Sequence, residues 1–164
     1  MRKLLIVLAL VPLLFSCSTK KDNSAQNIAL IEKYVQSVED LDYQVMEALL
    51  DDSYYGYGPS FGDSIGKEHA IANWQYNVEY LYESIKYIRS RNTAVSVGDG
   101  DNKGEWVSNW GELHIVYKED KKKVVIWANT IYRIENSKIV KSYTFYNEGD
   151  VLQQLGYSFI NLNY

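Results

Sequence analysis

The chain has 164 residues and a formal net charge of −4, from 17 basic and 21 acidic side chains. This balance does not favour a nucleic-acid-binding protein, which would need a basic patch. The single cysteine, Cys17, excludes an intramolecular disulfide and any cysteine-based zinc cluster.

The first residues have the pattern of an export signal. Arg2 and Lys3 precede an apolar run over residues 4–15, which is shorter than the roughly 20 residues that a membrane-spanning helix needs. The junction Leu14-Phe15-Ser16-Cys17 resembles the bacterial lipobox, in which the cysteine is acylated and the chain is cut before it. We therefore expect residues 1–16 to be a lipoprotein signal peptide and Cys17 to carry the lipid. The alternative is an ordinary secretory signal with an incidental cysteine.

Cleavage before Cys17 would leave 148 residues with 15 basic and 21 acidic side chains, for a net charge of −6. The polar residues that follow predict a flexible tether over residues 17–27, ahead of one domain over residues 28–164. The resemblance to lipoproteins implies a bacterial cell-envelope protein that is anchored to a membrane. Ser18 in place of Asp resembles the signal for the outer membrane of Gram-negative bacteria.

Three helices are predicted at the start of the domain. The first has an apolar stripe at Ile28, Ile31, Val35 and Val38. The second covers residues 43–50, with Asp42 as its N-cap. Residues 51–66 contain four glycines and a proline and predict a loop. The third helix begins near Lys67 and has a stripe at Ile71, Trp74, Val78 and Leu81.

The rest of the chain has the pattern of strands. Four are expected, over residues 85–97, 105–117, 124–134 and 139–146, and the short connectors between them predict antiparallel hairpins. Residues 151–155 form either a short helix or a tail. Helices followed by strands predict an α+β fold in which a curved antiparallel sheet packs against the N-terminal helices on one face.

Three stretches of the domain resemble the SnoaL-like branch of the nuclear transport factor 2-like superfamily. They are Ala48-Leu49-Leu50-Asp51-Asp52-Ser53-Tyr54 with the following Gly58-Pro59, Gly66-Lys67-Glu68-His69-Ala70-Ile71, and residues 132–140 with Phe145-Tyr146-Asn147. The resemblance covers about residues 28–156. It implies a cone-shaped α+β barrel that encloses a pocket. Members include isomerases, cyclases and dehydratases as well as non-enzymatic binding or dimerising modules, so the fold does not give the function.

The sequence departs from the family pattern at two places. Asn136-Ser137 replaces the usual Asp-Gly of a hairpin turn, and Asn147 stands where relatives often have Asp. An amide does not titrate, so Asn147 cannot act as a general acid or base. This departure favours a protein that is not an enzyme.

One pair of residues could transfer protons. His114 shares a strand face with Trp110 and Glu112, while the opposite face carries Leu113 and Ile115. If the first face lines the cone, Glu112 and His114 form a catalytic acid/base pair. If Leu113 and Ile115 face inward, the pair lies on a solvated outer face, which is the alternative that we favour.

Further side chains are candidates for a pocket because they are aromatic or carry an amide that needs hydrogen-bond partners if it is buried. They are Tyr57, Trp74, Trp110, Trp127, Asn129 and Asn147. Trp74 fits a core position better than a ligand contact. The loop from Asp99 begins like a calcium site but has Lys103 and Trp110 at two ligand positions, so we expect neither a metal nor a cofactor.

The sequence thus predicts a cell-envelope lipoprotein whose SnoaL-like domain binds a small apolar or aromatic molecule without catalysis, or serves as a dimerising module. The alternative is an isomerase, cyclase or dehydratase that uses Glu112 and His114. The expected partners are the membrane through the lipid anchor, a small apolar ligand and a second copy in a homodimer. No nucleic acid is expected.

Overall fold

The computed structural model describes residues 22–160, so the predicted signal peptide and Cys17 lie outside the described residues. Its helices are α1 (Ser24–Glu39), α2 (Tyr43–Leu49), α3 (Lys67–Tyr76), a π-helical turn η1 (Asn77–Leu81) and α4 (Glu148–Gln154). Its strands are β1 (Leu50–Tyr57), β2 (Ser64–Gly66), β3 (Tyr82–Val97), β4 (Gly104–Tyr117), β5 (Lys123–Glu135) and β6 (Lys138–Tyr146). No helix within residues 22–160 is long and apolar enough to cross a membrane.

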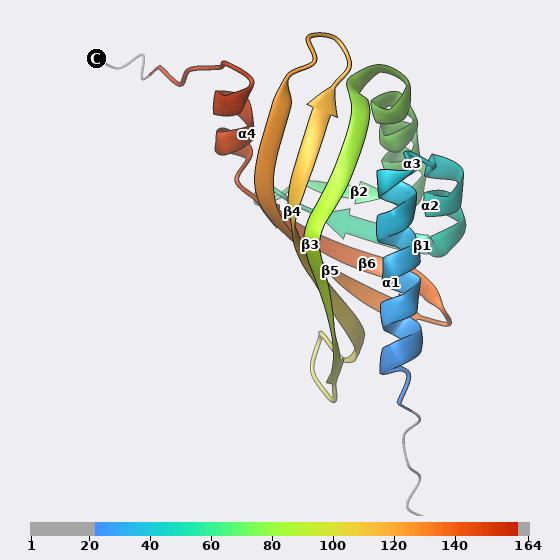
Figure 1. The fold of residues 1–164 in the computed structure, drawn as a ribbon. Coiled ribbons are helices and arrows are strands. Elements are labelled where there is room, and N and C mark those ends of the chain that lie inside the picture. Colours follow the sequence, from blue (N-terminus) through green and yellow to red (C-terminus); the bar gives the residue numbers. More distant parts are fainter. Residues whose placement is uncertain (1–21, 161–164) are drawn as a thin grey trace, which may run out of the picture.

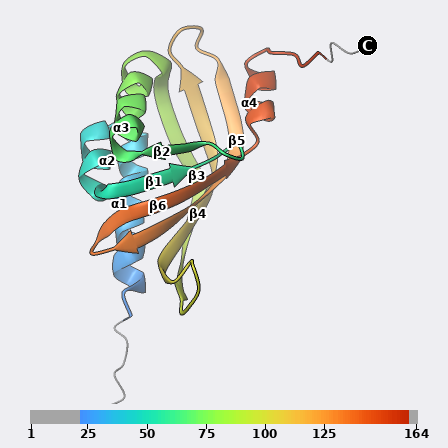
Figure 2. The same cartoon turned by 180° about the vertical axis from the view of Figure 1, so that it is seen from behind.

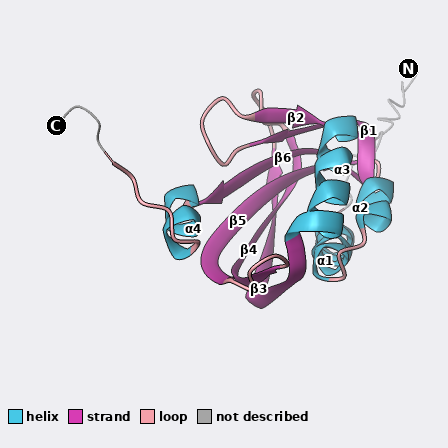
Figure 3. Ribbon diagram, turned by 90° about the horizontal axis from the view of Figure 1, so that it is seen from above, coloured by secondary structure: helices cyan, strands magenta, loops and turns pink. Residues whose placement is uncertain are grey.

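The six strands form one curved sheet in the order β2-β1-β6-β5-β4-β3. Neighbouring strands are antiparallel except for β1 and β6, which are parallel, so the sheet is mixed rather than wholly antiparallel. Figure 3 shows the strands bending round, with α1, α2 and α3 gathered at one end of the curve and α4 at the other. The α+β cone expected from the sequence is confirmed.

The predicted loop over residues 51–66 is wrong in part, because it contains most of β1 and all of β2. Gly56 is one of the four glycines on which the loop prediction rested. A Cβ atom at Gly56 would lie 2.6 Å from the Tyr54 hydroxyl and 3.3 Å from Ser142 Oγ. This glycine therefore permits close packing inside a strand and does not mark a turn.

Helix α1 packs against the concave face of the sheet (Figure 1). The predicted stripe residues Ile31, Val35 and Val38 are buried, and Tyr34 meets Tyr132 of β5 edge to face at 5.6 Å between ring centroids. The helix begins at Ser24, so residues 24–27, which were expected in the tether, belong to it. Ala25 and Gln26 are exposed and Asn27 is buried, so this polar stretch is the first turn of the helix and not a linker.

Helix α2 begins as predicted. The Asp42 carboxylate accepts a hydrogen bond from the Val45 backbone N–H at 3.0 Å, which satisfies one of the free donors of the first turn. The segment after α2 runs directly into β1, because Leu50 adopts an extended backbone at the C-cap.

The strand faces are clearly divided into an inner and an outer side. Leu113 and Ile115 of β4, together with Val124 and Ile126 of β5, are buried on the inner side. The residues between them point outward. Strand β3 has a bulge between Ile88 and Arg91, and such a bulge locally bends and twists a strand. Figure 2 views the outer side, where no helix of residues 22–160 crosses β1 and β6.

Candidate functional site

The concave side of the sheet encloses a cavity of about 270 Å³ beneath α1, α3 and α4. Residues of α1, α3, η1, α4 and of every strand except β2 contribute to its wall. The lining residues are Tyr34, Val38, Tyr54, Trp74, Asn77, Tyr82, Ile85, Tyr87, Leu113, Ile115, Tyr117, Ile126, Ala128, Thr130, Tyr132, Ser142, Thr144, Tyr146 and Val151. This set contains seven tyrosines and no Asp, Glu, His, Lys or Arg.

Hydroxyl groups are paired with one another along the inner wall. The Tyr54 hydroxyl lies 2.7 Å from Ser142 Oγ, and Thr130 Oγ1 lies 3.3 Å from Thr144 Oγ1. These contacts fix polar groups on an otherwise apolar surface. A few fixed polar groups on apolar walls are typical of pockets that orient a small molecule.

The phenols of the cavity stay protonated far above neutral pH. Burial raises the pKa of Tyr87 to about 12. Burial likewise raises the pKa of Tyr34, Tyr82 and Tyr132, because an ionised phenolate would be poorly solvated there. These side chains can donate hydrogen bonds, but none of them is suited to accept a proton at neutral pH.

Asn77 is the one amide in the lining set. It lies at the start of η1, and its side chain makes no hydrogen bond to another residue of the described chain. π-Helical turns occur frequently at functional sites. Its amide can therefore offer both a donor and an acceptor to a bound molecule.

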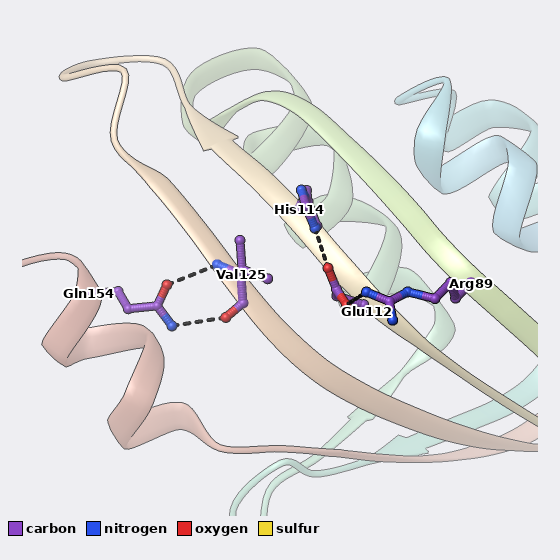
Figure 4. Close-up of polar contacts among 5 residues, drawn as sticks. All are labelled: Arg89, Glu112, His114, Val125 and Gln154. Atoms are coloured by element: carbon purple, nitrogen blue, oxygen red, sulfur yellow. Dashed lines mark hydrogen bonds and ion pairs between the residues drawn. The ribbon is translucent and has the colours of Figure 1, made fainter.

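Glu112 and His114 lie outside the cavity, on the outer face of β4. His114 Nε2 is 2.6 Å from Glu112 Oε1, and Arg89 Nη2 of β3 is 2.7 Å from Glu112 Oε2 (Figure 4). The hydrogen bond with His114 and the charge of Arg89 lower the pKa of the Glu112 carboxyl. The predicted pair is thus in contact, but it lies on the opposite face of β4 from Leu113 and Ile115, which line the cavity.

Two predicted pocket residues, Trp110 and Trp127, also point outward. Trp127 is 64% exposed and lies under the Arg89 guanidinium, whose carbon is 6.0 Å from the ring centroid. Asn129 is on the same outer side, where its Nδ2 donates to Ser108 Oγ and to the Asn109 carbonyl, both at 2.9 Å. The partners that a buried amide requires are therefore supplied by β4 and not by a ligand.

The remaining candidates are divided between the two sides. Trp74 was expected to fit the core better than a ligand site, and it lines the cavity. Tyr57 is on the outer side and stacks on Tyr143 with ring centroids 4.9 Å apart. Asn147 is exposed and caps α4, because its Oδ1 accepts from the Asp150 backbone N–H at 3.1 Å. Among residues 22–160 no three His, Cys, Asp or Glu side chains come close enough to hold a metal ion.

The tyrosines are the functional feature that sequence reasoning missed. Tyr117 continues the inner series of Leu113 and Ile115 at a period of two, and Tyr132 does the same after Ile126 on β5. Once the inner face of one strand is fixed, its tyrosines are assigned to the cavity. The sequence alone did not establish which face of each strand points into the cavity.

Several solved structures have a similar fold. A putative polyketide cyclase from Xanthomonas campestris pv. campestris is 15% identical, covers 82% of this chain and 100% of its own, and has a TM-score of 0.67. An LEH-like epoxide hydrolase from M. tuberculosis is 12% identical, with 83% and 89% covered and a TM-score of 0.62.

A hypothetical protein from Catenulispora acidiphila, which has a ketosteroid isomerase-like fold and was solved in complex with trimethylamine, is 13% identical. It covers 79% of this chain and 93% of its own, with a TM-score of 0.61. No protein-family model matches the sequence, and no curated protein matches it significantly. At these identities the likeness concerns the fold alone: the chain shares its α+β fold with solved structures that are named as SnoaL-like polyketide cyclases or described as ketosteroid isomerase-like.

Proposed function

We propose that the domain binds a small, neutral, largely apolar or aromatic molecule in its cone and does not transform it chemically. The observation that carries this proposal is the cavity lining, which combines seven tyrosines with aliphatic side chains and has no charged residue. Burying an unpaired charge costs far more than burying a neutral group, so a neutral ligand is favoured. The paired hydroxyls and Asn77 would set its orientation.

The alternative function is proton transfer by an isomerase, cyclase or dehydratase. Such chemistry needs a group that titrates near the working pH and reaches the substrate. Glu112 and His114 are separated from the cavity by the sheet itself, and burial holds the cavity phenols protonated. Neighbouring structures with cyclase or hydrolase names share the fold at 12–18% identity, which does not transfer their chemistry.

Binding of matched probes tests the proposal. A neutral polycyclic alcohol and the carboxylate with the same ring system are titrated against the protein at neutral pH, with tryptophan fluorescence and calorimetry as readouts. We expect the neutral probe to bind at least about tenfold more tightly, a difference of roughly 1.4 kcal/mol. Equal or tighter binding of the carboxylate would show that a cation, and not the neutral lining, selects the ligand.

We further propose that lipid on Cys17 holds this domain at the cell envelope, with the outer membrane favoured in a Gram-negative host. The support is the lipobox-like junction at residues 14–17. Cys17→Ser is expected to release the protein into the soluble fraction or to leave its precursor uncut, as followed by membrane fractionation and intact mass. Unchanged membrane partition and normal processing would contradict the anchor.

A second candidate function, dimerisation, is favoured by the outer face of the sheet. Trp127, Phe145 and Trp110 expose 64%, 53% and 40% of their surfaces there, and an aromatic patch of this kind marks an interaction site. Aromatic residues that are buried at an interface often dominate its affinity. We propose that two copies associate through this face.

Trp127→Glu is expected to convert that dimer into a monomer, because it replaces the most exposed of the three aromatic side chains with a charge. Tyr76→Glu is the matched control, since Tyr76 is 60% exposed on α3, away from the sheet's outer face. Light scattering measures the mass of both variants. A wild type that is already monomeric, or a Trp127→Glu variant that stays dimeric, would rule out this interface.

A further inference from the structure

The first five residues of β5 have an edge that no strand pairs with, beside α4. β6 pairs with β5 only from Ala128 onward, so Lys123, Val125 and Trp127 have β4 on one side and no strand on the other. In an antiparallel pair the N–H and C=O of one residue point the same way, and the direction alternates along the strand. The backbone groups of these three residues therefore face the open side, where an added strand could bind.

The Gln154 side chain occupies the middle of this edge. Its Oε1 accepts from the Val125 N–H at 2.9 Å, and its Nε2 donates to the Val125 carbonyl at 2.9 Å (Figure 4). One side-chain amide thus satisfies both backbone groups of Val125. These are the two hydrogen bonds that a residue directly opposite on a neighbouring strand would make.

The helix that carries Gln154 is weakly attached to the domain. α4 has seven residues and none of them is buried. Its C-terminal end is held by Lys122 Nζ, which donates to the Leu155 carbonyl at 2.6 Å, and its apolar contact comes from the partly buried Val151 and Leu155. Segments with few buried apolar contacts open at low free-energy cost. Gln154 can therefore leave Val125 without unfolding the sheet.

The sequence of the open edge is complementary to itself. A two-fold axis at Val125 would pair Val125 with Val125, Lys123 with Trp127, and Val124 with Ile126. Each copy of Val125 would donate its N–H to the other and accept in return, replacing both bonds of Gln154. Lys123 would lie beside the Trp127 ring on the outer face, where a cation and an aromatic face attract each other.

We propose that Lys123–Trp127 is a self-association edge that pairs antiparallel with the same segment of a second copy, and that Gln154 keeps it closed. This contact uses backbone groups at the strand edge, whereas the proposed outer-face dimer uses exposed aromatic side chains, and Trp127 borders both. The edge contact doubles the mass of a chain that is otherwise monomeric. In a chain that already dimerises through the outer face, it adds a second two-fold contact, from which longer assemblies can grow.

Gln154→Ala tests the proposal in the full-length chain, because it removes the cap and leaves the edge unchanged. Gln154→Asn is a second variant, since its amide is one methylene too short to reach Val125. Gln153→Ala is the control, as Gln153 is an exposed neighbour on the same helix whose side chain makes no such contact. Native mass spectrometry across a dilution series gives the mass, and hydrogen exchange at the Val125 amide gives the location.

We expect both Gln154 variants to form species heavier than the wild type as concentration rises, and the Val125 amide to exchange quickly when dilute and slowly when associated. Gln153→Ala should behave like the wild type. Wild-type mass at every concentration would overturn the proposal, as would a heavier species in which the Val125 amide stays unprotected. Unfolding of both Gln154 variants would show that α4 is part of the core and not a removable cap.

Discussion

Replacing Ala128 by phenylalanine is expected to lower the affinity for a neutral apolar probe by about a hundredfold, or roughly 2.8 kcal/mol. Ala128 lies on the inner face of β5 and lines the cavity. The benzyl group would extend into a space of about 270 Å³ and occupy the volume that the ligand needs. Calorimetric titration with the neutral polycyclic alcohol measures the loss.

The matched control is Ala72→Phe, which makes the same change on an exposed position of α3. It should bind like the wild type. Urea unfolding checks that Ala128→Phe is still folded, because overpacking can cost about 1–3 kcal/mol. Undiminished binding by a folded Ala128→Phe variant would place the ligand outside the cone.

The domain is expected to lose stability steeply between about pH 10 and pH 12, because its buried tyrosines cannot ionise while folded. Burial raises the pKa of Tyr87 to about 12, whereas an unfolded tyrosine titrates near 10. The stabilisation is therefore complete below about pH 10 and is lost as the pH rises toward 12. Two pKa units correspond to about 2.7 kcal/mol for Tyr87 alone.

Tyr34, Tyr82 and Tyr132 add to this effect, since burial raises the pKa of each of them as well. Urea unfolding and tyrosinate absorbance are followed together as the pH is raised. Tyr87→Phe should retain more of its neutral-pH stability than the wild type does, while Tyr76→Phe, on the surface, should not. Ionisation of all tyrosines near pH 10 without unfolding would mean that the cavity is open to water.

The three N-terminal helices and the four long strands follow from local sequence patterns. The apolar residues of α1 have helical spacing, and Asp42 is a side chain suited to capping. In β4, apolar residues such as Leu113 alternate with polar residues such as Glu112. Each of these features depends on residues within one turn or one strand. Local chemistry was therefore sufficient to predict them.

The site could not be predicted to the same degree, because it depends on which face of the sheet the helices cover. Trp127 and Ala128 are adjacent, yet the larger apolar side chain points outward and the small one lines the cavity. Hydrophobicity alone favours the opposite assignment. The packing of α1 determines which face of the sheet is the inner one, and this packing joins residues that are far apart in the chain.

Two other features depend on tertiary contacts in the same way. Gly56 is a residue type common in loops, but here it lies in a strand that packs closely against Tyr54 and Ser142. Gln154 caps Val125, which is 29 positions away in the chain. Neither contact can be predicted from the neighbouring residues in the sequence. Asn147 likewise takes its role as the cap of α4 from a helix that the pattern left undecided.

The most direct test of non-catalytic binding is native mass spectrometry of the protein purified from its own host. We predict one co-purifying neutral molecule in the wild type, absent from Ala128→Phe, which is returned unchanged after prolonged incubation with fresh protein. An empty wild-type cone, a charged ligand, or conversion of the molecule into a product of different structure would contradict the account.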